Sequence, residues 1–361
     1  MKKFLKYMSP FAPDQSGACS VFYEFGGLIV ICDAGGCAGN ICGFDEPRWF
    51  DKKSAVFSAG LRDMDAIMGR DDKLIEKLSL AYDQLGGNFA LIVSTPVPAV
   101  IATDMRSLER MGEKKLGIPC IALDCTGTHY YDNGEEKAWL RLFETFAKDK
   151  KDTVKGRIGI LGATPMETGF KSGDSLKELL PRLNDSSSDA GEYVIYSMGS
   201  TLEDVKDAST CEKNIVISSQ SLKAAEYLKE TFGIPYEIKY PFIPEDIIEN
   251  VKKEVSGNIL IIRSQFASNE LRNIIKDSSV DTEMIDCATW FSLNKEYAED
   301  NDTALLGEDD LTDLLKEKEY DTIIADSDCL NLLKSVGFTG RFIDYPEFAV
   351  SGRGFDFTGI I

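Results

Sequence analysis

The chain has 361 residues, a formal net charge of −20 and a pI near 4.6. Its apolar residues make up 43% of the sequence, enough to bury sizeable cores, which excludes global disorder. The acidic balance argues against nucleic acid and anionic membrane surfaces as partners, and no segment reaches the length of a membrane span. The lysine-bearing N-terminus lacks the apolar run of a signal peptide. We therefore expect a cytoplasmic protein of two or three domains.

Predicted strands and helices alternate along the chain. In the first part, strands are expected at 26–31, 89–95 and 118–125, helices at 72–85 and 135–148, and a loop at 126–134. The charged, apolar-poor segment 148–156 is interpreted as a linker, and two further units of the same kind follow it. Strands separated by helices imply parallel sheets with helices on both faces. The sequence thus predicts an α/β protein of three domains, at 1–150, 151–252 and 253–361.

Four cysteines in the first domain suggest a ligand site. Cys32, Cys37 and Cys42 stand five residues apart in a glycine-rich segment after a predicted strand, and Cys19 lies upstream. A reducing compartment argues against a disulfide framework, and zinc sites usually use paired cysteines with closer spacing. Iron–sulfur ligation fits better, because glycines such as Gly36 let backbone N–H groups approach inorganic sulfide. Packing of buried thiols is the alternative.

Two other residues are candidates for proton transfer at this site. His129 is the only histidine of the chain, so any His-dependent catalysis or ligation must use it. It falls in the loop after a strand, where ligands of parallel sheets bind, and is either a proton donor or a structural residue. Asp33, beside Cys32, is either a ligand or proton donor, or a cap of the following turn. No dinucleotide or P-loop motif is present, so neither NAD binding nor ATP hydrolysis is expected.

Several segments, taken in order, resemble those of a known family. They are SGACS, ICDAGGC, FSAGLRDMDAIMGRDDKLIEKL, FALIVSTPVPAVIATDM, IPCIALDCTGTHYYDNG and, in the second domain, STCEKNIVISSQSLKAAEYLKETFGIPYE. This order is similar to the nitrogenase component 1 family over nearly the whole chain. The family includes the nitrogenase molybdenum–iron protein subunits, the dark-operative protochlorophyllide reductase catalytic subunits and the nickel-sirohydrochlorin reductive cyclases.

The resemblance implies three Rossmann-like domains, each a parallel sheet flanked by helices, and an iron–sulfur cluster, [4Fe–4S] or larger, at a subunit interface. Cys19 matches the first cluster cysteine of the family, and Cys37, which closes DAGGC, matches the second. The place of the third cysteine is held by Pro96, which cannot ligate, so Cys32 or Cys42 is expected to substitute. The resemblance also implies electrons from an ATP-dependent iron protein.

The resulting hypothesis is the catalytic component of a nitrogenase-like oxidoreductase that transfers electrons to an unidentified substrate. It is expected to form a dimer with itself or with a homologous subunit. No histidine follows His129, so no iron–molybdenum cofactor of the nitrogenase type is expected. The residues expected at the site are Cys19, Cys32, Cys37, Cys42 and Gly36 for the cluster, and His129 and Asp33 for catalysis. A non-catalytic scaffold for metallocluster assembly and a small-molecule binding protein of the same fold are the alternatives.

Overall fold

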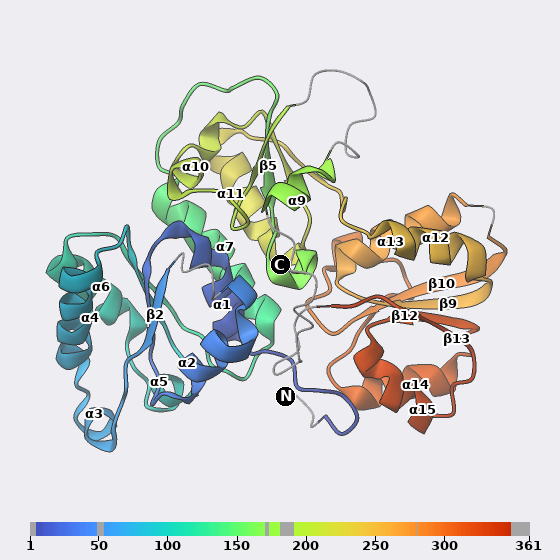
Figure 1. The fold of residues 1–361 in the computed structure, drawn as a ribbon, viewed down its shortest axis with the longest axis horizontal. Coiled ribbons are helices and arrows are strands. Elements are labelled where there is room, and N and C mark those ends of the chain that lie inside the picture. Colours follow the sequence, from blue (N-terminus) through green and yellow to red (C-terminus); the bar gives the residue numbers. More distant parts are fainter. Residues whose placement is uncertain (1–4, 49–53, 170–172, 181–190, 279, 348–361) are drawn as a thin grey trace.

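The computed structural model describes residues 5–48, 54–169, 173–180, 191–278 and 280–347. Within these ranges three parallel sheets follow one another along the chain, each accompanied by helices (Figure 1). The α/β fold expected from the alternating pattern is thereby confirmed. No helix in the described ranges is both long enough and apolar enough to cross a membrane.

The first sheet has the strand order β2-β1-β3-β4, and helices cover both of its faces. Side chains alternate along each strand, so Ile29 and Ile31 pack with α1 and α7, whereas Leu28 and Val30 pack with α4 and α6. The strands are β1 (Leu28–Ile31), β2 (Ala55–Ser58), β3 (Ala90–Val93) and β4 (Cys120–Leu123). The helices are α1 (Asp14–Phe22), α2 (Gly36–Asn40), α3 (Asp63–Met68), α4 (Asp71–Leu85), α5 (Pro96–Val100), α6 (Met105–Leu116) and α7 (Tyr131–Phe146).

The second sheet has the order β6-β5-β7-β8, and the third has the order β11-β10-β9-β12-β13. The second domain contains β5 (Arg157–Leu161), β6 (Glu192–Ile195), β7 (Lys213–Val216), β8 (Tyr236–Ile238), α8 (Pro165–Thr168), α9 (Gly173–Lys177), α10 (Leu202–Lys206) and α11 (Leu222–Phe232). The third sheet is built from β9 (Gly257–Ile262), β10 (Thr282–Thr289), β11 (Thr303–Ala304), β12 (Thr322–Ala325) and β13 (Arg341–Asp344), with α13 (Gln265–Lys276), α14 (Glu308–Glu317) and α15 (Leu330–Ser335) beside it. Helix α12 (Glu245–Glu254) crosses the expected boundary at 252/253 and contacts α13 and β13.

Helix α7 begins earlier than its sequence suggests. The sequence predicts a loop over 126–134, which contains the Asn–Gly pair of YYDNG, and a helix from 135, yet the helix already starts at Tyr131. The reason is its contact with α1, in which glycines allow the two helices to touch. A β-carbon on Gly17 would lie 2.0 Å from the carbonyl oxygen of Tyr131, and one on Gly134 would lie 1.7 Å from that of Asp14. Tertiary packing therefore overrides the local turn preference.

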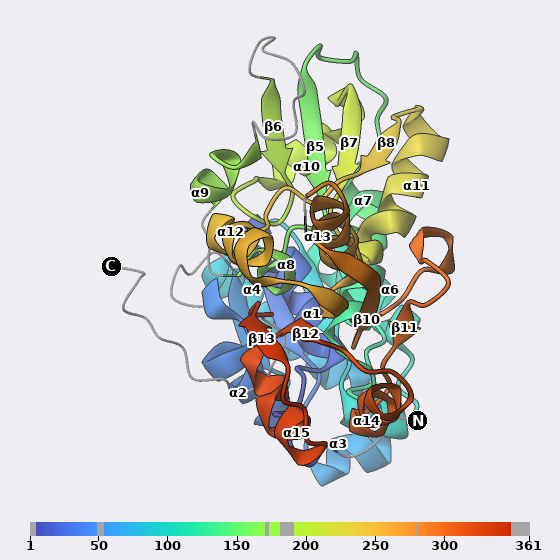
Figure 2. The ribbon, with the colours of Figure 1, turned by 90° about the vertical axis from the view of Figure 1, so that its right-hand side faces the viewer.

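The N-terminal segment ties the third domain to the first. Glu308, the first residue of α14, accepts three successive backbone N–H groups from Lys6, Tyr7 and Met8 at 2.7–2.8 Å. Further along, Pro13 forms an antiparallel bridge with Tyr130 at the start of α7. Figure 2 shows the third domain, with β13 and α15, turned toward the viewer.

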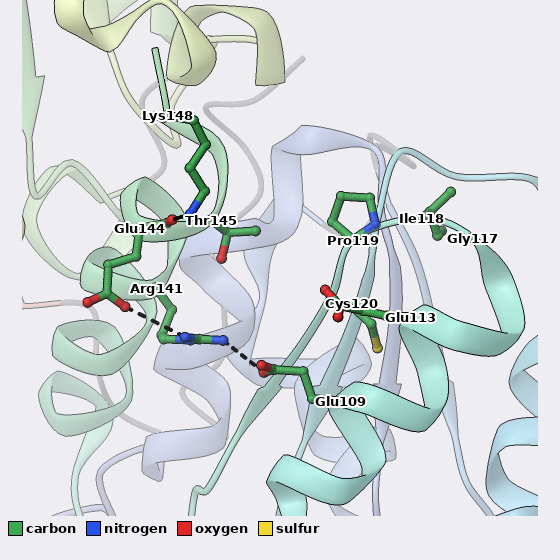
Figure 3. A pocket seen from close by; sticks show the side chains of 10 residues that line it. All are labelled: Glu109, Glu113, Gly117, Ile118, Pro119, Cys120, Arg141, Glu144, Thr145 and Lys148. Atoms are coloured by element: carbon green, nitrogen blue, oxygen red, sulfur yellow. Dashed lines mark hydrogen bonds and ion pairs between the residues drawn. The ribbon is translucent and has the colours of Figure 1, made fainter. Parts of the chain in front are cut away.

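Strand β4 is an edge strand, and a groove between α6 and α7 runs beside it. Figure 3 shows one end of this groove, a cavity of about 540 Å³ at the start of β4. Glu109 of α6 accepts the outward N–H of Ala122 at 2.8 Å, and Arg141 of α7 donates to the same carboxylate oxygen at 2.8 Å. The exposed edge is thus occupied by a charged side chain, which prevents pairing with another strand.

Candidate functional site

Three loops meet at the carboxyl end of the first sheet, as the sequence predicts. Thr95, after β3, donates its hydroxyl to the carbonyl oxygen of Cys32, after β1, at 2.7 Å. A β-carbon on Gly127, after β4, would lie 2.5 Å from the ring of Pro96. This edge therefore gathers residues from three chain segments, at the place where α/β sheets bind ligands.

The glycine-rich segment that carries Cys37 and Cys42 is helical and not a loop. The chain leaves β1 and turns at Gly35, whose φ of 125° requires glycine. It then forms α2, with Cys37 near its start, and a π-helical turn, η2 (Ile41–Asp45), which contains Cys42. The cysteines are therefore held on regular backbone just past the strand end.

Asp33 holds the start of α2 in place. One of its carboxylate oxygens accepts the N–H of Ala38 at 2.8 Å, and the other accepts the hydroxyl of Ser58, the last residue of β2, at 2.5 Å. The side chain is almost completely buried. This is the capping role that the sequence offered as one of the two readings of Asp33.

Cys19, Cys42 and Cys125 lie in one neighbourhood. Cys19, on α1, and Cys125, just after β4, are completely buried, whereas Cys37 and Cys42 are half-buried. Burial raises the pKa of the Cys19 thiol well above its ordinary value, and the nearby charges of Cys125 and Cys42 raise it further. Burial and Asp33 raise the pKa of Cys37, and the hydroxyl of Thr95 lowers it in part.

Cys32 lies apart from the other candidate ligands. Its side chain belongs to the apolar cluster under α4 and α6, whereas Cys19 belongs to the cluster under α1 and α7 on the opposite face. Burial, together with the charges of Asp33 and Asp71, raises the pKa of Cys32 to about 12. The sequence spacing suggested one group of three cysteines, but the alternation of side chains at the strand end separates this one.

The glycines around Cys37 and Cys42 face open space. A β-carbon built on Gly36, Gly39 or Gly43 would meet no described atom beyond its own helical turn within 4 Å. None of these three has a left-handed backbone, so neither conformation nor packing among the described residues requires glycine there. The surface beside the two half-buried cysteines is therefore open to the close approach of another molecule.

Acidic residues next to the cysteines stabilise the local backbone. Asp45 accepts the hydroxyl of Ser16 on α1 at 2.7 Å. Glu46 forms an ion pair with the buried Arg48 at 2.7 Å. The guanidinium of Arg48 also donates to the carbonyl oxygens of Ser20, beside Cys19, at 2.6 Å and of Ser197, in the second domain, at 2.7 Å. This arginine connects the cysteine helix α1 to the second domain.

His129 lines a cavity between the first and third domains. The cavity has a volume of about 610 Å³, and its walls include Tyr130, Trp290 and Phe291. His129 itself is exposed, and its backbone carbonyl accepts the N–H of Asp14 at 3.1 Å. The histidine is evident in the sequence, but the aromatic wall formed by Trp290 and Phe291 is not, because it comes from the loop after β10.

Asp132, which the sequence does not single out, also lines this cavity and binds the third domain through Ser292. Its carboxylate accepts the backbone N–H and the hydroxyl of Ser292, the N–H at 2.9 Å. The side chain is 1% exposed although it lies in a stretch expected to be a loop. The only sequence signal for it was its position between two aromatic residues and an asparagine.

The cysteines suit an iron–sulfur cluster chemically but do not complete a site within one chain. Thiolates are the ligands that such clusters take, and a bound metal offsets the raised pKa of its cysteines by its own charge. Among the described residues, however, no three His, Cys, Asp or Glu side chains are close enough together to hold one metal ion. The donor set thus fits a shared site with further ligands from another molecule.

The fold and the cysteine-bearing edge define a class, a three-domain α/β protein with a thiol-rich strand end. Comparison with known protein families identifies which proteins of this class the chain is related to. The sequence signature of the nitrogenase component 1 type oxidoreductases matches residues 14–251, well over half of the chain. The protein therefore belongs to the nitrogenase component 1 type oxidoreductase family.

Solved structures support the fold. The structure "Nitrogenase Cp1 at pH 6.5" is similar with a TM-score of 0.71 and 11% sequence identity, over 99% of this chain and 90% of that chain. The structure "Nitrogenase Cp1 at pH 5" is similar with a TM-score of 0.66 and 15% identity, over 96% of this chain and 87% of that chain. No curated protein sequence matches.

Proposed function

We propose that this chain is the catalytic component of a nitrogenase-like reductase, in which Cys19, Cys37 and Cys42 supply thiolates to an iron–sulfur cluster, [4Fe–4S] or larger. The observation that carries the proposal is the incomplete set of cysteines beside an open glycine surface, in a chain of this family. A bound cluster supplies low-potential electrons. Cys125 borders the group, and Cys32 is left out because it lies on the other face of the sheet.

A second copy of the chain, or a homologous subunit, completes the site in this proposal. A two-fold axis near α2 places the same surface opposite itself and doubles the number of thiolates. In such a dimer, the lack of side chains at Gly36, Gly39 and Gly43 lets the partner backbone come close. This supports the interface on the cysteine side of the first sheet.

An ATP-dependent iron protein delivers the electrons in this proposal. Helix α3, which follows β2 at the same sheet edge as the cysteines, has no buried residue. Its side chains Met64, Ile67 and Met68 are exposed, Ile67 by 75%. Such an apolar patch on a soluble surface is typical of a protein contact, and α2, α3 and α5 lie together at one end of the first domain (Figure 1). The patch is therefore suited to a docking partner close to the cluster.

In this proposal, the substrate occupies the cavity that is lined by His129. The cavity opens at the carboxyl end of β4 and beside the loops after β10 and β11, which is the ligand end of both sheets. Its aromatic walls supply apolar contact surface, and the imidazole of His129 is suited to proton transfer.

The experiment that tests the cluster is anoxic purification, followed by iron and acid-labile sulfide analysis and an EPR spectrum before and after dithionite. We expect stoichiometric iron and sulfide with a reducible signal, and loss of both in Cys37→Ala. Cys32→Ala is the matched control and keeps its iron. Full iron retention in Cys37→Ala would refute the ligand assignment. A cluster that passes to an acceptor protein without reductase activity would support the assembly scaffold instead, and a colourless folded protein after reconstitution would support a binding protein.

The subunit contact is tested separately by Gly39→Leu. A β-carbon at this position meets no described atom beyond its own helical turn, so the monomer should accept the new side chain and fold as before. It would obstruct a second copy on this surface, and sedimentation should report more monomer than in the wild type. An unchanged dimer would move the interface away from α2.

A further inference from the structure

A row of buried carboxyl groups runs from the His129 cavity to the junction of the three domains. Asp132 lines the cavity, and Glu135 lies one turn further along α7, on the same helix face. Glu167, on α8 after β5, belongs to the second domain, and Glu347, after β13, belongs to the third. Their exposed fractions are 1%, 0%, 2% and 5%, respectively. Four buried carboxyl groups from three domains need an explanation, because acidic side chains are rarely buried.

Glu135 has a partner on one oxygen only. The hydroxyl of Thr164, after β5, donates to that oxygen. The other oxygen is completely buried and has no hydrogen-bond partner among the described residues. The charged groups that reach Glu135 are Glu167 and Asp132, which raise its pKa, and the more weakly acting Arg48, which lowers it. Burial is the largest influence and keeps its pKa well above the ordinary value.

Glu167 also has a hydrogen-bond partner on only one of its two carboxyl oxygens. The hydroxyl of Ser264 donates to one of its oxygens at 2.7 Å, and the second oxygen is buried without a partner in the described part of the chain. Arg263 is the cation that faces it, and this guanidinium also faces Glu347. Burial raises the pKa of Glu167 to about 8 and that of Glu347 to about 7.

The unsatisfied oxygens argue against a purely structural role. A buried polar atom without a hydrogen bond is costly, so Glu135 and Glu167 each weaken the fold compared with an apolar residue that fits the space. One guanidinium between two carboxyl groups cannot neutralise both if both ionise. The arrangement instead favours carboxylic acids whose free oxygens are available to a water molecule or a ligand group.

We propose that Glu135 and Glu167 are held as carboxylic acids and form a proton store for chemistry in the His129 cavity, with Asp132 as the member of the row at that cavity. The inference rests on the proposed reductase function. Each two electrons that the iron-protein reductase supplies must be matched by two protons when a substrate bond is hydrogenated. For each proton, a carboxylic O–H bond breaks, the proton goes to the substrate, and the carboxylate regains a proton from water.

Infrared spectroscopy tests whether the two acids hold protons. Carboxylic acids and carboxylates absorb at distinct carbonyl frequencies, and the measurement is made on the full chain without any cluster. We expect the wild type at pH 7 to show carboxylic-acid absorption that falls in Glu135→Gln and again in Glu167→Gln. The matched control is Glu136→Gln, the neighbouring residue paired with Lys223 on the surface, which should leave the band unchanged. No decrease in either variant would overturn the proposal.

The connection to the cavity is tested by Asp132→Asn. Because the charge of Asp132 raises the pKa of Glu135, its removal should move the infrared titration of Glu135 to lower pH. An unmoved titration would separate the acids from the cavity and overturn the proton store. These measurements are independent of iron. A chain that holds the protons but binds no cluster loses only the reductase function, whereas a chain that binds iron without carboxylic-acid absorption loses only the store.

Discussion

Replacement of Glu167 by glutamine should change how stability depends on pH. The pKa of Glu167 is raised by burial from the ordinary value of 4.5 to about 8, so the folded protein binds this proton more tightly than the unfolded chain. At 1.36 kcal/mol for each pH unit, the gap between the two values sets an upper limit of about 5 kcal/mol. Below pH 4.5 this contribution to the free energy of unfolding is present in full. It is lost progressively as the pH rises to 8, because only the unfolded chain gains from ionisation.

Glutamine keeps the shape of the side chain and its amide oxygen can still accept from Ser264, but it cannot ionise. Glu167→Gln should therefore match the wild type near pH 5 and exceed it at pH 8 by several kcal/mol. Urea unfolding at pH 5, 6, 7 and 8 measures the difference between the two proteins. Glu230→Gln, on the exposed face of α11, makes the same chemical change at the surface and should follow the wild type throughout. A constant difference between Glu167→Gln and wild type across this range would refute the reasoning.

Three further substitutions test local contacts. Glu109→Ala leaves the edge N–H of Ala122 without its carboxylate, and urea unfolding should show a loss of about 1–3 kcal/mol together with a greater tendency to aggregate. Asp33→Ala removes the cap at Ala38, and the free energy of unfolding should fall by about 0.5–2 kcal/mol. Cys37, in α2, should then be alkylated faster. An unchanged alkylation rate would contradict the capping role. Glu308→Ala releases three backbone N–H groups of the N-terminal segment, so limited proteolysis should cut there sooner than in the wild type.

The parts of the fold that were predicted correctly are those that depend on local pattern. Apolar runs such as 89–95 and the periodic helix 72–85 appear as β3 and α4 within a few residues. The convergence of three loops at one sheet edge also follows from parallel strands alone. Asp104 caps the start of α6 by accepting the N–H of Ser107, a contact within one turn of chain.

The errors occur where distant segments decide local structure. Helix α1 was not anticipated, because its hydrophobic residues show no one-sided pattern: all of its side chains are buried, polar ones included. The expected start of α7, at residue 135, is too late because Gly134 lies inside the helix, where it allows the close contact with α1. Cys32 was grouped with the other cysteines by spacing, although the direction of its side chain depends on how β1 is buried.

The residues of the candidate site also divide into those that the local sequence reveals and those that only the packing of distant segments reveals. The cysteines are visible in the sequence because three of them are regularly spaced beside glycines, whereas Glu135 and Glu167 resemble ordinary helix-surface acids until the domains pack around them. In a chain with 60 acidic residues, composition cannot distinguish the few that are buried. Their identification requires the contacts of Thr164 and Ser264, which come from other domains.

The acidic residues around the cysteines explain how a thiol site can be assembled from distant segments. Asp14, at the start of α1, accepts the N–H groups of Thr126 at 2.9 Å and Gly127 at 2.7 Å, in the loop that follows Cys125. The same carboxylate therefore fixes the helix that carries Cys19 relative to the strand end that carries Cys125. Such carboxylates also raise the pKa of nearby thiols, which disfavours bare thiolates. A metal centre brings positive charge that offsets this preference, so in the proposed cluster site the metal would have to displace protons from thiols that the surrounding carboxylates keep protonated.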